Sequence, residues 1–159
     1  MPTDRILLSN YIQANKILCF ALIAGQIFFA LVAIFLVNFA GIDINDAELN
    51  EVFIFIVPTL GIASLLGSII VFKGKLSRIK EISDISAKLT EYRSAQIIRW
   101  ALYEGPSFFA IVVYILTGEV YYLGMVILAL ILFGMTFPSQ ERLVKDLDLS
   151  WEDQNRLGE

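Results

Sequence analysis

One carboxylate, Glu104, lies inside a long apolar stretch and is followed directly by Gly105 and Pro106. It comes seven residues after Ile97, where the stretch begins. In a helix that rises about 1.5 Å per residue, it is therefore about 10 Å inside the apolar boundary. An ionised carboxylate at that depth in a membrane costs several kcal/mol. We therefore expect the Glu104 side chain to be a protonated acid, or to be paired with a hydrogen-bond donor or a cation.

Pro106 changes the backbone beside this carboxyl group. A proline inside a helix has no N–H to donate to the carbonyl group four residues earlier, here that of Leu102, and its ring pushes that carbonyl away. We therefore expect a bend at Gly105 and Pro106, with a free carbonyl oxygen close to Glu104. A carboxyl group beside a free carbonyl oxygen can bind a proton or a small cation.

Other polar residues fall at a similar depth and are candidates for the same proton or ion site: Gln26, Ser64, Ser68 and Ser107. Two interpretations remain open. The set can form a working proton or ion site, or Glu104 can be held by Gln26 or a serine in a hydrogen bond that only joins helices. We expect Glu104→Leu to harm transport or assembly more than Gln26→Leu does.

The composition is that of a membrane protein. Hydrophobic residues make up 57% of the 159 residues and charged residues only 18%, against about 25% charged residues in soluble domains. Crossing a bilayer takes about 20 apolar helical residues. Spans are predicted at about 17–37, 46–72, 97–117 and 120–137, the second starting before its apolar run at the capping-box spacing of Asn45 and Glu48.

The basic residues predict how these spans are oriented. The 12 Lys and Arg residues precede the first span, follow the fourth, or lie between the second and third or just inside the third. None falls in 38–51 or in 118–119. Because cationic loops stay on the cytoplasmic side, both termini are expected to be cytoplasmic. The chain is then a multi-pass protein of the bacterial cytoplasmic (inner) membrane.

Segments 17–37 and 97–117 resemble each other at an offset of 80 residues. The matches include the small-residue pair Ala21 and Gly25 with Ala101 and Gly105, and such pairs allow helices to approach closely. Both segments leave the cytoplasmic side, so the repeat is parallel. The predicted fold is an all-α membrane protein with four transmembrane helices, an antiparallel bundle containing a parallel two-hairpin internal repeat.

Two amphipathic segments complete the predicted organisation. The connection 75–93 has apolar residues every three or four positions, which indicates an interfacial helix or a helical extension packed on its neighbours; a docking surface for a partner or for anionic lipid is the alternative. We expect a transmembrane domain at 1–138 and a short cytoplasmic helical tail at 139–159, with a second helix start at Ser150 to Asp153.

Several classes of protein are excluded by missing residue types. The chain has no histidine, and Cys19 is its single cysteine, so we expect no metal site, no redox pair, no cofactor and no nucleophile paired with a base. It also has no phosphate-binding glycine loop and no pair of intramembrane aspartates, so we expect it not to be an enzyme. A net charge of −4 argues against binding to nucleic acid.

The segment from Arg93 to Leu116 resembles the C-terminal helix of the c subunit of rotary ATP synthases, through Ile97, Ile98, Ala101, Leu102, Glu104, Gly105, Phe109, Val112 and Val113. In that family the glutamate on this helix carries the translocated proton or sodium ion, so the resemblance implies that role for Glu104. The chain departs from that family in Pro106 and in its long charged connection. As a whole it resembles the uncharacterised four-span proteins of bacterial inner membranes.

Two classes of function therefore remain. One is a small proton- or cation-translocating protein, or a subunit of one, that uses Glu104. The other is a structural or accessory membrane subunit in which Glu104 forms a hydrogen bond between helices. In both cases the expected partners are the lipid bilayer and either further copies of the chain or a larger membrane complex.

Overall fold

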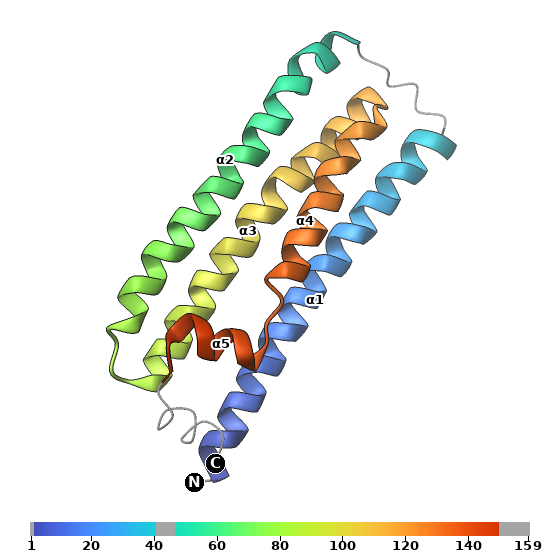
Figure 1. Cartoon of the computed structure of the whole chain (residues 1–159). Helices are drawn as coiled ribbons and strands as arrows, with labels where there is room; N and C mark the ends of the chain where they lie inside the picture. The colour runs from blue at the N-terminus through green and yellow to red at the C-terminus, as the bar shows by residue number, and fades with distance from the viewer. Residues whose placement is uncertain (1, 41–46, 150–159) are drawn as a thin grey trace.

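The computed structural model describes residues 2–40 and 47–149, and within these ranges the chain is helical and contains no strand (Figure 1). The elements are α1 (Pro2–Phe39), α2 (Ala47–Lys80), α3 (Ile85–Thr117), the 3-10 helix η1 (Val120–Leu123), α4 (Gly124–Met135) and α5 (Gln140–Leu147). The predicted all-α class is confirmed. Asn45, in the predicted capping box, and the helix start predicted at Ser150 to Asp153 lie outside the described residues.

Three helical segments are long and apolar enough to cross a membrane: Asn10–Phe39, Glu48–Lys80 and Ile85–Thr117. The pair formed by Val120–Met135 and Gln140–Leu147 meets the same criterion only when both parts are taken together, and it is bent by 79°. The described chain therefore has three such helices, or four if the bent pair counts as one span.

The polar connection at 75–93 is not a separate helix. It forms the last turns of α2 and the first turns of α3, so the structure has the helical extension rather than the interfacial helix. Asp84 ends the short link between the two helices, because its side chain accepts a hydrogen bond from the backbone N–H of Ala87 at 2.8 Å and so caps α3. The two helices thus continue beyond the apolar runs that the sequence shows.

At the other end of the bundle, Gly118 closes α3. Its φ of 72° is in the left-handed region, which favours glycine, and its N–H donates to the carbonyl oxygen of Tyr114 at 2.8 Å. The turn between α3 and η1 is therefore tight. It sends η1 and α4 back along α3.

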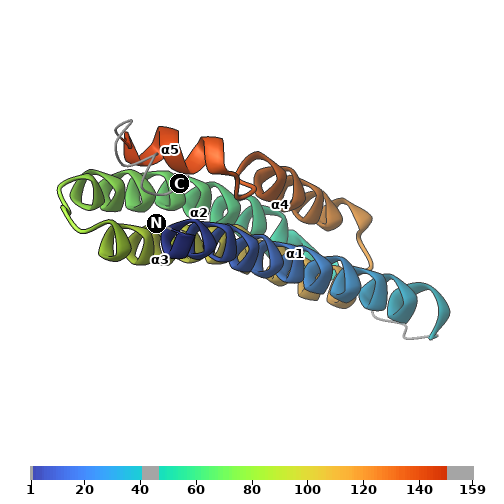
Figure 2. The same ribbon diagram turned by 90° about the horizontal axis from the view of Figure 1, so that it is seen from below.

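Helix α3 is the centre of the bundle and contacts α1, α2 and α4. Figure 2 shows α4 and α5 on one side of the molecule and α1 and α3 on the other. Helices α1 and α3 run in the same direction, and hydrogen bonds between them join residues 78, 81 and 76 positions apart. The two similar segments of the sequence therefore lie side by side at nearly the offset at which they match.

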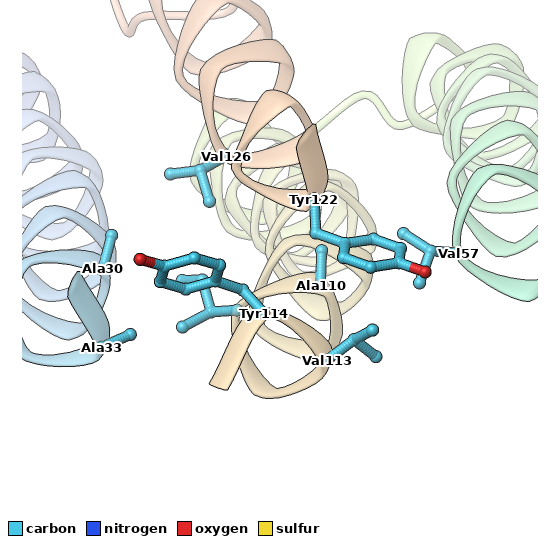
Figure 3. Packing of buried hydrophobic residues seen from close by; sticks show 9 residues of the cluster. Ala30, Ala33, Val57, Ala110, Val113, Tyr114, Tyr122 and Val126 are labelled. Atoms are coloured by element: carbon cyan, nitrogen blue, oxygen red, sulfur yellow. The ribbon is translucent and has the colours of Figure 1, made fainter. Parts of the chain in front are cut away.

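Small side chains on α1 make room for a tyrosine from α3. Figure 3 shows the Tyr114 ring directed towards Ala30 and Ala33, and all three side chains are buried. On the other side of the same cluster, the Tyr122 ring of η1 reaches Val57 of α2. Burying these rings against small and β-branched residues joins α3 to α1 and η1 to α2.

Helix α5 covers the end of the bundle at which α2 ends and α3 begins, which we name the α5 end. Ser139 caps α5 by accepting a hydrogen bond from the N–H of Arg142 at 3.2 Å. Leu143 and Leu147 are buried in a cluster with side chains of α2 and α3, Phe72 and Leu89 among them. The amphipathic tail segment is therefore docked on the bundle.

Leu147→Ala is expected to loosen α5. Leu147 is 1% exposed, and removing a buried leucine side chain costs about 2–5 kcal/mol. Amide hydrogen exchange in α5 should then become at least about tenfold faster. Gln140→Ala, at an exposed position of the same helix, should leave the exchange rate unchanged. Equal rates in wild type and Leu147→Ala would mean that Leu147 does not hold α5 in place.

Candidate intramembrane site

Glu104 lies on the outer face of α3, where Ala101 and Gly105 are exposed beside it. Its side chain is only partly buried, and it forms no hydrogen bond or ion pair within residues 2–40 and 47–149. A Cβ atom added at Gly105 would meet none of the described atoms within 4 Å. The carboxyl group is therefore partly exposed near the middle of α3, without a partner among the residues that the structure describes.

Gln26 and Ser107 form the polar contact inside the bundle. Both are fully buried, and Gln26 Nε2 donates a hydrogen bond to Ser107 Oγ. Gln26 Oε1 is buried and has no hydrogen-bond partner in the described part of the chain. A donor and an acceptor so placed join α1 to α3 at mid-depth. Neither Gln26 nor Ser107 forms a hydrogen bond with Glu104.

The two serines of α2 are separate from both groups. Ser68 is buried and its Oγ donates to the carbonyl oxygen of Leu65 at 2.7 Å, while Ser64 is partly buried. Of the predicted site residues, the structure thus joins Gln26 and Ser107 by a hydrogen bond and gives Glu104 no such link to any of the others.

Ser107→Ala is expected to lower the free energy of unfolding by about 1–3 kcal/mol. The change leaves the buried Gln26 side chain without its acceptor, and an unsatisfied buried polar group costs about that much. Denaturant unfolding in detergent micelles measures it. The double variant Ser107→Ala with Gln26→Leu should recover most of the loss, because both polar groups are then gone. Ser64→Ala is the control, and a loss of equal size there would contradict the assignment.

Helix α3 continues without interruption through Gly105 and Pro106. Pro106 is buried and shares a small cavity with Gly61 of α2 and Met125 of α4, whereas Gly105 is exposed. The proline ring therefore packs inside the bundle, while Gly105 is exposed and Glu104 is partly exposed. The bend expected at these two residues stays a prediction.

The small-residue pairs do not bring the helices of one chain together. Ala21, Gly25, Ala63, Ala101 and Gly105 are exposed, and Gly67 is partly exposed. A Cβ atom at any of these glycines would have no described neighbour within 4 Å. The bundle turns other faces of α1, α2 and α3 inward, so a close approach of helices at these pairs stays a prediction for contacts with other chains.

A second polar group, which the sequence analysis missed, lies near the α5 end. Gln96 Nε2 donates to Tyr92 Oη at 2.8 Å, and Tyr92 Oη donates to Asp146 Oδ2 at 2.7 Å. Asn15 and Gln96 are both 5% exposed, and one amide oxygen of each is without a partner among the described residues. They line a cavity of about 20 Å³, about the size of one water molecule.

The spacing of residues along α1 contains the signal for part of this group. The buried positions Asn15, Cys19, Gln26, Ala30 and Ala33 are three, four or seven residues apart, which places them on one helical face. Polar residues on a face that otherwise carries buried small and apolar side chains can be recognised as interior polar contacts. The partner positions on α3 follow only once the two helices are placed in register.

Arg99 points to the α5 end and not towards Glu104. Its Nε donates to Tyr103 Oη at 2.7 Å, and its guanidinium carbon lies 4.5 Å from the centre of the Phe72 ring. Arg99 and Glu104 form no ion pair in the part of the chain that the structure describes. Arg99 and Tyr103 line an open cavity of about 490 Å³ together with residues of α4 and α5.

No group of three or more His, Cys, Asp or Glu side chains that could hold a metal ion occurs within the part of the chain that the structure describes. No family model, no curated protein and no solved structure matches the chain. The local resemblance to the ATP synthase c subunit therefore stays a prediction.

Proposed function

We propose that the chain is a four-span protein of the bacterial inner membrane, built from two parallel hairpins and with both termini in the cytoplasm. The parallel register of α1 and α3 supports the repeat. The segment Val120–Met135 runs back along α3 after the turn at Gly118 and supports the fourth span. The absence of basic residues from 38–51 and 118–119 supports the orientation.

We further propose that the protein acts with a second copy of itself, and that the Glu104 carboxyl groups of the two copies together hold a proton or a small cation. The observation that carries this proposal is the position of Glu104: on the outer face of α3, without a hydrogen-bond or ion-pair partner among the described residues. In hydrocarbon, a polar group without a partner is costly. A second protein surface removes that cost.

A second copy fits this face for two reasons. A two-fold axis beside α3 places the same residue of each copy on both sides of the contact, so the two Glu104 side chains meet. The exposed Ala101 and Gly105 allow the two α3 backbones to approach closely. Two adjacent carboxyl groups do not ionise together, so they share a proton or bind a cation.

Translocation within a single copy has little support. The polar pair at mid-depth, Gln26 and Ser107, is fully buried, and neither of its members forms a hydrogen bond with Glu104 among the described residues. A proton or cation would instead move along the contact between copies. A structural or accessory membrane subunit is the second candidate, since paired carboxyl groups join two helices whether or not they titrate.

Cysteine cross-linking tests the contact between copies. In a background with Cys19→Ala, which removes the single native cysteine, Ala101→Cys should form a disulfide-linked dimer under mild oxidation in membranes. The bond requires Cα atoms within about 7 Å of each other. Ile70 of α2 is 70% exposed, and the Ile70→Cys variant should stay monomeric. Equal cross-linking at both positions, or none at Ala101→Cys, would reject the contact.

A further inference from the structure

We propose that the open cavity at the α5 end binds the phosphate group of a membrane phospholipid. The cavity, which we name the headgroup pocket, has a volume of about 490 Å³ and is lined by Arg99 and Tyr103 of α3, Thr136, Ser139, and Arg142 and Lys145 of α5. Its lining residues come from both sides of the 79° bend between α4 and α5. Figure 1 shows how these two helices meet.

The cations of the pocket are available to an anion. Arg99 Nε is bound to Tyr103 Oη, and the guanidinium group lies over the Phe72 ring, which fixes its position while leaving its charge uncompensated by an acid. In the part of the chain that the structure describes, Arg99, Arg142 and Lys145 form no ion pair. An arginine guanidinium can bind phosphate through two parallel hydrogen bonds.

Two acids also line the pocket, Glu141 and Asp146. Asp146 accepts a hydrogen bond from Tyr92 Oη at 2.7 Å, so part of its charge is already solvated by the protein. Three cations against two acids leave the pocket positive, and the hydroxyl groups of Thr136 and Ser139 add polar lining. The balance favours an anionic group over a cation.

The depth of the pocket points to a lipid and not to a phosphate free in water. Arg99 lies at the beginning of the apolar run of α3, and Thr136 lies at the end of the apolar run of α4. Trp100 Nε1 donates to Thr136 Oγ1 at 3.3 Å, so both boundaries are at one level. This level is where headgroups meet hydrocarbon.

An apolar surface continues from the pocket towards the middle of the membrane. Met135 lines the pocket and is 63% exposed. Towards the beginning of α4, Ile131 is 54% exposed and Leu128 is 41% exposed. Their spacing of three and four residues places them on one face of the helix. A phospholipid whose phosphate is held by Arg99 and Arg142 can lay an acyl chain along this face.

Native mass spectrometry of the full chain in a non-ionic detergent, titrated with dioleoylphosphatidylglycerol, tests the pocket. Wild type should bind the lipid, and Arg99→Gln and Arg142→Gln should each bind about tenfold more weakly, as expected for losing a charged hydrogen bond. Arg78→Gln removes an exposed arginine from the end of α2, outside the pocket, and should bind as wild type does.

Three results would overturn the proposal. The first is wild-type affinity for the lipid in both pocket variants, and the second is an equal loss of affinity in Arg78→Gln. The third is displacement of the lipid by inorganic phosphate at the same concentration, which would make this a site for a free anion. Arg99→Gln also removes the bond to Tyr103 and can destabilise the fold. If its melting temperature falls, Arg142→Gln decides, since the Arg142 side chain forms no bond with the described residues.

Discussion

Glu104→Leu is expected to abolish proton or cation flux and to weaken the association of two copies by about tenfold. An interhelical hydrogen bond in a membrane is worth about 1–2 kcal/mol, and about 1.4 kcal/mol is a factor of ten in affinity. Flux is measured in liposomes that contain a pH- or sodium-sensitive dye, and association by energy transfer between labelled copies in the same liposomes. Because leucine keeps the volume but cannot bond, both signals should fall together.

Glu104→Gln separates the two candidate functions. Glutamine can still form reciprocal hydrogen bonds across the contact, but it does not titrate. We therefore expect association close to that of wild type together with loss of flux. Ser64→Leu is the control for Glu104→Leu, because it also replaces a polar side chain by leucine, at a partly exposed position of α2. It should change neither flux nor association.

The outcomes point to different conclusions. If wild type shows no flux and Glu104→Leu still separates the copies, Glu104 is a structural contact and the protein an accessory subunit. If Glu104→Leu leaves association intact, the outer face of α3 is not the contact between copies. Gln26→Leu should affect flux and association less than Glu104→Leu does, because Gln26 bonds to Ser107 inside the bundle.

The helical class and the approximate place of each apolar helix could be predicted because a membrane leaves little choice. Every backbone N–H and C=O group must be bonded within the segment, and apolar runs of about 20 residues mark such segments. The turn at Gly118 could be predicted from glycine chemistry. The merging of 75–93 into α2 and α3 could not, because an amphipathic pattern is the same for a free interfacial helix and for a packed extension.

The candidate site was harder to predict, because depth in a membrane can be read from the sequence but the direction of a side chain cannot. Glu104 and Gln26 have similar depths, yet Glu104 is partly exposed and Gln26 is 0% exposed. Which face of α3 turns inward is decided by side chains far apart in the sequence. The Tyr114 ring of α3 packs near Ala30 and Ala33 of α1, and contacts of this kind fix the rotation of the helix.

Trp100→Ala is expected to cost about 3–5 kcal/mol of unfolding free energy, the usual range for a fully buried large aromatic side chain. Trp100 is 0% exposed, and its ring centre lies 6.5 Å from that of Phe133. It belongs to the buried cluster that joins Cys19 of α1 to α3 and α4. Denaturant or thermal unfolding in micelles measures the loss.

Two matched variants identify the cause of that loss. Trp100→Phe keeps a ring but removes the N–H that bonds to Thr136. It should cost far less, because Thr136 Oγ1 still donates to the Leu132 carbonyl oxygen at 2.8 Å. Phe28→Ala removes an aromatic ring that is 69% exposed and should be nearly neutral. If Phe28→Ala cost as much as Trp100→Ala, the outer face of α1 would be a packed surface, and the contact between copies would extend beyond α3.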